Sequence, residues 1–123
     1  MTLEEMISLM NQDLMNEWMH MRFYLHHAST VVGLHCHEYK EIMLKEAASE
    51  MGHVAEFSDA IVGLGGQPTT QSNDFPSFTD PGDIMRHAVR IEEDVVRNYA
   101  DRIEQSKSLG GADGAWLEIF YEN

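Results

Sequence analysis

The stretch that decides the fold is residues 45–64, KEAASEMGHVAEFSDAIVGL. Apolar residues recur through it at alternating spacings of four and three, as on a helix that packs against near-parallel helices. This inward row contains Met43, Ala47, Val54, Phe57, Ile61 and Leu64. Glu50 fills the one step that is missing between Ala47 and Val54. A carboxylate at a core position is costly unless it is paired or binds a metal.

His53 follows Glu50 by about one helical turn, so both side chains are expected to point into the same part of the interior. Such Glu-x-x-His pairs supply ligands in helix bundles that bind two iron ions. A Glu and a His at this spacing also occur by chance on solvated helix faces. The metal interpretation therefore requires matching interruptions in the other helices.

The N-terminal region has the same kind of pattern. Thr2 and Glu5 have the spacing of a capping box, which predicts a helix start, and Gly33 ends the periodicity. The predicted inward row is Leu3, Ile7, Met10, Leu14, Glu17, Met21, Tyr24, Ala28 and Val31. Glu17 is the acidic member of this row. Alternatively, the row is displaced by one residue and Glu17 lies at its solvated edge.

A third long helix is predicted after Asp80, which can cap it, and Pro81, which suits the first helical position. Gly110-Gly111 is its expected end. The predicted inward row is Met85, Ala88, Glu92, Val95, Tyr99 and Ile103. A row through Glu93 also fits the spacing, and we prefer the one through Glu92.

The connections predict how the helices are arranged. The short turn after Val32 predicts that the first helix and a second one, over residues 36–64, are antiparallel neighbours. Residues 65–83 hold all three prolines, and this length predicts a crossover along the bundle. Phe75 and Phe78 are expected to pin the crossover against the helices.

Asp113 is the expected cap of a fourth helix. It has about ten residues, where a full partner for the other helices would need about 25. The chain either has a short fourth helix or is cut within it. We therefore predict an all-α, up-down helical bundle that forms a single domain over residues 1–123.

Composition excludes several classes of function. The net charge is −13, from 21 acidic and 8 basic residues, which disfavours nucleic-acid binding and suits attraction of cations. No apolar run approaches the roughly 20 residues that span a membrane, and the N-terminus lacks the pattern of a signal peptide. A single cysteine, Cys36, fits a reducing compartment. We expect a cytoplasmic protein that binds neither membrane nor nucleic acid.

Several motifs together resemble the ferritin-like superfamily, in its bacterioferritin and Dps-like branch. They are Asn16-Glu17-Trp18 with Tyr24 and His27-Ala28; Glu46-Ala47-x-x-Glu50-Met51-x-His53; Leu64-Gly65-Gly66-x-Pro68; and Glu92 seven residues before Tyr99. The resemblance covers residues 1 to about 108. It implies a ferritin-like bundle that oxidises Fe(II) with oxygen or peroxide at a di-iron site, often in an iron-storing shell.

The resemblance implies that Glu17, Glu50, His53 and Glu92 are iron ligands and catalytic residues, with manganese as an alternative metal. Tyr24 and Tyr99 would lie beside the centre. Family members carry a further Glu-x-x-His in the fourth helix, which this chain lacks. Glu118 or Glu122 could supply a carboxylate in its place, Glu122 being the preferred metal ligand. His20, three residues after Glu17, is the surplus imidazole near the ligand layer.

Three other interpretations remain open at this stage. The chain could be a ferritin-like oxidase of another substrate, a Dps-like shell protein, or a metal-free structural protein of the same fold. The lack of a basic cluster disfavours a DNA-binding shell. The short fourth helix leaves an apolar trough open, so we expect a homo-oligomer. Metal analysis would separate the metal-free alternative from the others.

Overall fold

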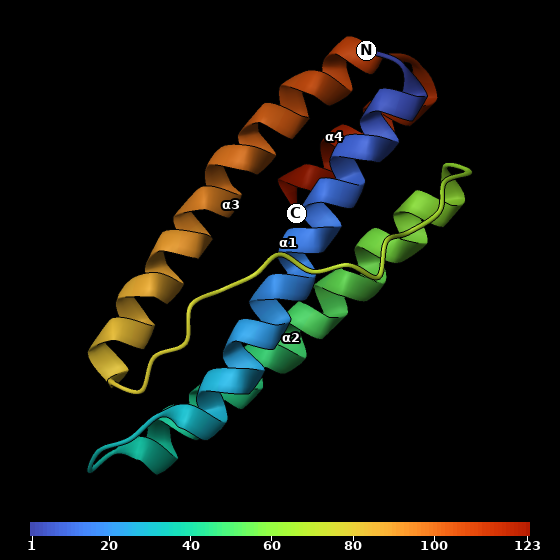
Figure 1. Cartoon of the computed structure of the whole chain (residues 1–123). Coiled ribbons are helices and arrows are strands. Elements are labelled where there is room, and N and C mark those ends of the chain that lie inside the picture. The colour runs from blue at the N-terminus through green and yellow to red at the C-terminus, as the bar shows by residue number, and fades with distance from the viewer.

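The computed structural model describes residues 1–123, which form four α-helices. They are α1 (Leu3–Thr30), α2 (Cys36–Gly63), α3 (Pro81–Leu109) and α4 (Gly111–Glu122). The three long helices lie side by side, and short α4 turns back from α3 and lies behind α1 (Figure 1). The predicted all-α bundle, with a long connection between α2 and α3 and a short fourth helix, is confirmed.

Local sequence signals determine where two of the helices begin. The Thr2 hydroxyl accepts a hydrogen bond from the Glu5 N–H at 3.1 Å, and the Glu5 carboxylate accepts one from the Thr2 N–H at 2.9 Å. This reciprocal capping box satisfies backbone donors that have no partner within α1. Asp80 caps α3 by accepting from the Asp83 N–H at 3.1 Å.

The start of α4 differs from the prediction, which had Asp113 as the cap. The helix begins at Gly111, directly after Gly110, so Asp113 lies in its first turn. Gly110 and Gly111 have φ values of 69° and 67°, which glycine adopts without strain. Because these two residues reverse the chain at once, no separate capping side chain is needed between α3 and α4.

The core consists of two hydrophobic clusters at opposite ends of the bundle. One cluster contains Phe23 and Ile84, near the end of α1 and the start of α3. The other contains Met10 and Leu117, near the start of α1 and within α4. Between the clusters, midway along the helices, buried polar side chains replace apolar ones.

The connection between α2 and α3 runs along α1 (Figure 1). Near its start, the Asn11 side chain accepts a hydrogen bond from the Thr69 N–H at 2.9 Å. Near its end, the Thr30 hydroxyl donates to the Phe78 carbonyl at 2.8 Å. Phe75 and Phe78 pack against the core, as predicted. Polar side chains of α1 therefore hold the crossover in place.

The helix α1 is buried on more sides than a single inward row predicts. Three predicted members of that row, Leu3, Ile7 and Met21, are only partly buried. A second row at seven-residue spacing is fully buried: Met6, Asp13, His20 and His27. The physical reason is that α1 contacts α2, α3 and the crossover, so more than one of its faces lies away from solvent.

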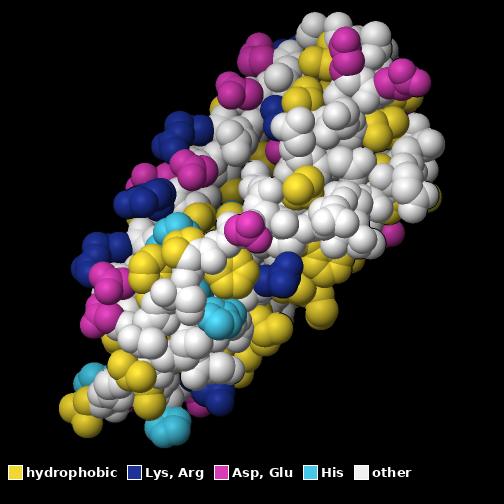
Figure 2. Space-filling view, in the orientation of Figure 1, with side chains coloured by type: hydrophobic (Ala, Val, Ile, Leu, Met, Phe, Trp, Pro, Cys, Tyr) yellow, Lys and Arg dark blue, Asp and Glu magenta, His cyan; other side chains and the backbone are white.

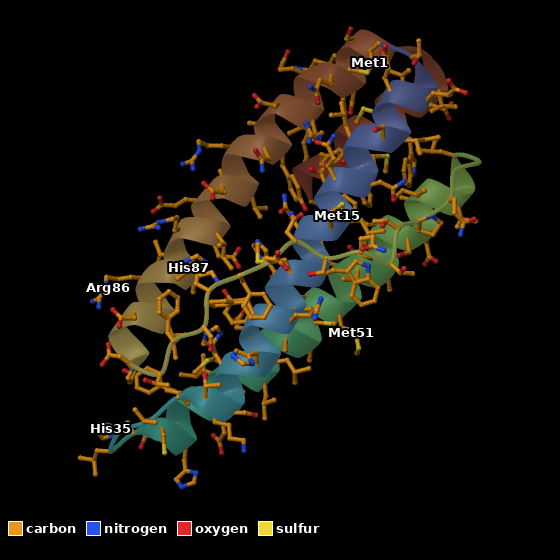
Figure 3. The ribbon with its side chains drawn as sticks, viewed as in Figure 1. Met1, Met15, His35, Met51, Arg86 and His87 are labelled. Carbon is orange, nitrogen blue, oxygen red and sulfur yellow. The ribbon has the colours of Figure 1, made fainter.

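The surface is strongly charged along α3, where basic and acidic side chains alternate (Figure 2). Arg86 lies on the outer side of this helix and Met51 on the outer side of α2 (Figure 3). None of the four helices combines the length and the apolar character that crossing a lipid bilayer requires.

Candidate metal centre

Three helices bring five of the predicted ligand side chains together midway along the bundle. Glu17 and His20 come from α1, Glu50 and His53 from α2, and Glu92 from α3. Each pair on α1 and α2 is one helical turn apart and projects from one face. The ligand atoms form two groups, and within each group they all lie within 4.8 Å of one another.

The first group contains Glu17, Glu50 and His53. The Nδ1 atom of His53 lies 3.0 Å from Glu50 Oε2 and 3.4 Å from Glu17 Oε2. Both carboxylates are buried, whereas the His53 side chain is 46 % exposed. The imidazole therefore lies on the solvent side of this group.

The second group contains His20, Glu50 and Glu92. The Nδ1 atom of His20 lies 3.5 Å from Glu92 Oε1 and 4.0 Å from Glu50 Oε1. Here the imidazole is buried and the outer carboxylate, Glu92, is 47 % exposed. The two oxygens of Glu50 face different groups, so this one carboxylate joins them.

Two tyrosines hold the two outer carboxylates, meaning those of Glu17 and Glu92, which lie on either side of the shared Glu50. The Tyr99 hydroxyl donates to Glu17 Oε1, and the Tyr24 hydroxyl donates to Glu92 Oε1 at 3.1 Å. Burial, together with the adjacent carboxylate, raises the pKa of both phenols, so both remain protonated donors. The prediction that these tyrosines lie beside the centre is confirmed. Tyr99 leaves Glu17 Oε2 free on the side of His53, whereas Glu92 Oε1 both accepts from Tyr24 and faces His20.

The centre concentrates negative charge. Burial and the neighbouring carboxylates of Glu17 and Glu92 raise the pKa of Glu50 to about 10, which keeps this carboxyl protonated at neutral pH. The neighbouring His20 imidazole, whose Nδ1 lies 3.5 Å from Glu92 Oε1, lowers the pKa of Glu92. A cation placed among these groups would favour the ionised form of every carboxylate and displace the proton from Glu50.

Two polar atoms of the centre, Glu17 Oε2 and His20 Nδ1, are buried without a hydrogen-bond partner. Buried polar atoms are nearly always partnered, so both call for an additional group. Glu17 belongs to the first ligand group and His20 to the second, so each group has one such atom. Carboxylate oxygens combined with imidazole nitrogens suit iron or manganese. The donor set therefore fits a pair of metal ions that share Glu50.

Two other predicted positions lie differently. Glu122 is exposed and belongs to neither ligand group, although it lines the same cavity of about 540 Å³ as Glu17 and Glu50. Glu93 is exposed, while Glu92 belongs to the second group. Of the two rows that the spacing of α3 allows, the structure therefore has the one through Glu92 at the centre.

A buried network next to the centre was not predicted from the sequence. Asp13 is 1 % exposed. Its carboxylate accepts hydrogen bonds from Arg102 Nε at 2.8 Å, from Arg102 Nη2 at 3.1 Å and from the Tyr121 hydroxyl at 2.6 Å. It thus joins α1, α3 and α4. The available signal was its place seven residues before His20, in the second buried row of α1.

Comparisons with known proteins agree with this architecture. The family model described as "Ferritin-like domain" matches residues 7–113. The crystal structure of ferritin-like, diiron-carboxylate proteins from Bacillus anthracis str. Ames superposes with a TM-score of 0.88 at 28 % identity, over 98 % of this chain and 84 % of that chain. The bacterioferritin-related protein from Bacteroides fragilis, a dodecameric thioferritin, superposes with a TM-score of 0.75 at 18 % identity, over 98 % and 79 %. No curated protein sequence matches the chain.

Proposed function

Because the chain belongs to the ferritin-like domain family, we propose that it binds iron at the Glu/His centre and oxidises Fe(II) with dioxygen or a peroxide. The observation that carries the proposal is the shared carboxylate, since the oxygens of Glu50 face two separate ligand groups. The related structure from Bacillus anthracis is described as that of diiron-carboxylate proteins, which supports two irons here.

In the proposed reaction Fe(II) is the substrate. Each Fe(II) loses one electron, so two Fe(II) and two protons reduce one hydrogen peroxide to two waters, or one dioxygen to hydrogen peroxide. The chain's contribution is to hold two cations close together in a buried, acidic site. Glu17, Glu50, His53 and Glu92 would be the principal ligands. Tyr24 and Tyr99 would keep the outer carboxylates oriented by their hydrogen bonds.

Loading requires a proton to leave. Glu50 holds a proton at neutral pH in the metal-free chain because burial and adjacent carboxylates raise its pKa to about 10. Each uptake event at Glu50 must therefore release that proton, and affinity should rise with pH.

We also propose that the chain assembles with copies of itself. The related Bacteroides fragilis protein is described as dodecameric. On α3 of this chain, Val89 and Val96 are 56 % and 72 % exposed, and on α4 Ile119 is 61 % exposed. Apolar side chains of this kind are suited to contacts between subunits. Light scattering at micromolar concentration tests the assembly, and a monomer there would contradict it.

The test of the proposed activity is the isosteric variant Glu50→Gln, with Glu46→Gln as the matched control. Glu46 is an exposed glutamate one turn earlier on α2 and belongs to neither ligand group. Anaerobic Fe(II) titration, followed by addition of dioxygen or hydrogen peroxide, should show uptake and rapid oxidation in the wild type and the control only.

The same substitution should stabilise the metal-free protein. Folding at pH 7 forces Glu50 to take up a proton, because its pKa rises from 4.5 to about 10. At about 1.4 kcal/mol per pH unit between 4.5 and 7, Glu50→Gln should gain up to about 3.5 kcal/mol in the presence of a chelator. This difference between the variant and the wild type should grow as pH rises from 4.5 to 7. Unchanged iron uptake in Glu50→Gln would overturn the proposed function.

A further inference from the structure

His20, the buried histidine of α1 that lies in the centre, has no hydrogen-bond partner at its Nδ1 atom. His20 is 2 % exposed, and its Nδ1 makes no hydrogen bond. The nearest ionisable atoms are Glu92 Oε1 at 3.5 Å and Glu50 Oε1 at 4.0 Å. Both distances leave room for an ion between the groups.

A comparison within the same helix separates this residue from an ordinary core histidine. His27 is fully buried, and both of its ring nitrogens are satisfied. Its Nδ1 lies 2.7 Å from the Phe23 carbonyl, and its Nε2 accepts from the Phe78 N–H at 3.0 Å. The His20 ring has no such backbone partners, so protein hydrogen bonding does not account for its burial.

The two ligand groups have the same composition. Each contains one imidazole, one outer carboxylate held by a tyrosine, and the shared Glu50. His53 supplies the imidazole of the first group, and His20 supplies that of the second. In di-metal helix bundles the second imidazole usually comes from a second Glu-x-x-His helix. Here the second group contains an imidazole from α1, one turn after Glu17.

We propose that His20 Nδ1 is a ligand of the second metal ion, together with Glu50 and Glu92. This inference rests on the proposed function and adds one residue to it. A cavity of about 340 Å³ is lined by His20 together with the polar side chains of Asn16, Asp94 and Asn98. Metal-bound histidines usually donate their second ring N–H to a carboxylate, carbonyl or water, and this polar cavity offers such partners.

The experiment uses Co(II) as the probe, because it does not react with dioxygen at the centre on the time scale of dialysis. Chelator-treated protein is equilibrated with Co(II) and the bound metal is counted by elemental analysis. The wild type should hold about two ions per chain, and His20→Asn should hold about one, with the second affinity reduced by more than about 100-fold. His53→Asn should also lose one ion. His26→Asn, an exposed histidine two turns along α1, should keep both.

Proton NMR of the Co(II) form supplies a readout that needs no variant. A histidine bound to a paramagnetic ion gives a strongly shifted ring N–H signal, so the wild type should show one such signal for each of the two imidazoles. A single signal in a fully loaded wild type would overturn the inference even if His20→Asn failed to fold.

The outcomes distinguish an error in the role of His20 from an error in the proposed function. If the wild type binds Co(II) and Glu50→Gln does not, but His20→Asn binds like the wild type, only the role of His20 is wrong. If the wild type takes up no Co(II) or Fe(II), the proposed function itself is wrong.

Discussion

Removing Arg102 while keeping Asp13 tests the buried network that joins α1, α3 and α4. In Arg102→Met, the Asp13 carboxylate keeps only the Tyr121 hydroxyl of its three hydrogen bonds. Asp13 is 1 % exposed, and the Arg102 side chain is 11 % exposed, so water does not replace the lost partner readily. The variant leaves a buried charge without its counter-ion, the situation in which breaking an ion pair is most costly.

The structure also sets an upper limit on this loss. An uncompensated Asp13 can escape its charge by binding a proton, which costs about 1.4 kcal/mol for each pH unit above its ordinary pKa of 3.8, or about 4 kcal/mol at pH 7. Burial already raises the pKa of Asp13 in the wild type despite Arg102, so part of this cost is present before mutation. We therefore expect Arg102→Met to lower the free energy of unfolding by about 3 kcal/mol at pH 7.

Urea denaturation followed by circular dichroism, in chelator, measures this loss. Because protonation limits the cost, the difference between variant and wild type should shrink to below about 2 kcal/mol at pH 5. Asp13→Asn combined with Arg102→Met should recover much of the loss at pH 7. Arg97→Met is the control, since it breaks an exposed pair with Asp94 and should cost less than about 1 kcal/mol. A loss in Arg102→Met that is below 1 kcal/mol, or equal at both pH values, would refute this reasoning.

Two further predictions concern the crossover and the short helix. The pKa of His27 is lowered because burial disfavours its charged form, and its neutral Nε2 accepts a hydrogen bond from the Phe78 N–H. The unfolded chain therefore binds this proton more readily than the folded chain does. The contribution of His27 to stability should accordingly fall as pH drops below about 6.5. Amide exchange at Phe78 should accelerate relative to the rest of the core between pH 7 and pH 5, and equal protection at both values would contradict this assignment. A Cβ at Gly114 would lie 2.6 Å from the Ser106 carbonyl oxygen, so Gly114→Ala should force α4 away from α3 and cost about 1–3 kcal/mol in thermal or urea unfolding. Gly52→Ala, in a helix and with nothing within 4 Å of the new atom, should instead stabilise by about 0.5–1 kcal/mol, and a similar effect at both positions would count against the packing explanation.

The sequence predicted the helices well because long helices leave a periodic apolar row. The acidic residues that interrupt those rows, Glu17, Glu50 and Glu92, all reach the centre. Within α3 the periodicity alone allowed Glu93 as well, since two adjacent rows contained enough apolar residues. Only the packing of α3 against its neighbours separates the two.

The parts that could not be predicted depend on burial from more than one side. A single inward row on α1 assumes one buried face, so it left Asp13 at the surface. Arg102 gives no apolar signal on α3, and its partner lies 89 positions away in the chain. The start of α4 was missed because Gly110 and Gly111 reverse the chain through left-handed backbone conformations, which replaces the cap expected at Asp113.

The second half of the crossover has almost no slack. Its anchors on α1, at Asn11 and Thr30, are separated by roughly 19 residues of helix, or about 29 Å. Between these anchors the Asn73 N–H donates to the Met15 carbonyl, so the chain from Thr69 to Asn73 advances only about 6 Å along α1. The five residues from Asn73 to Phe78, which reach about 17 Å when fully extended, must cover most of the rest.

Most surface loops accept insertions and deletions because their length is not constrained. The segment from Asn73 to Phe78 behaves instead as a strap of fixed length. Deleting one residue would shorten its reach by about 3 Å, so it would have to release one of its anchors or draw the end of α2 toward the start of α3. The length of this irregular segment is therefore as much a part of the fold as the length of any helix.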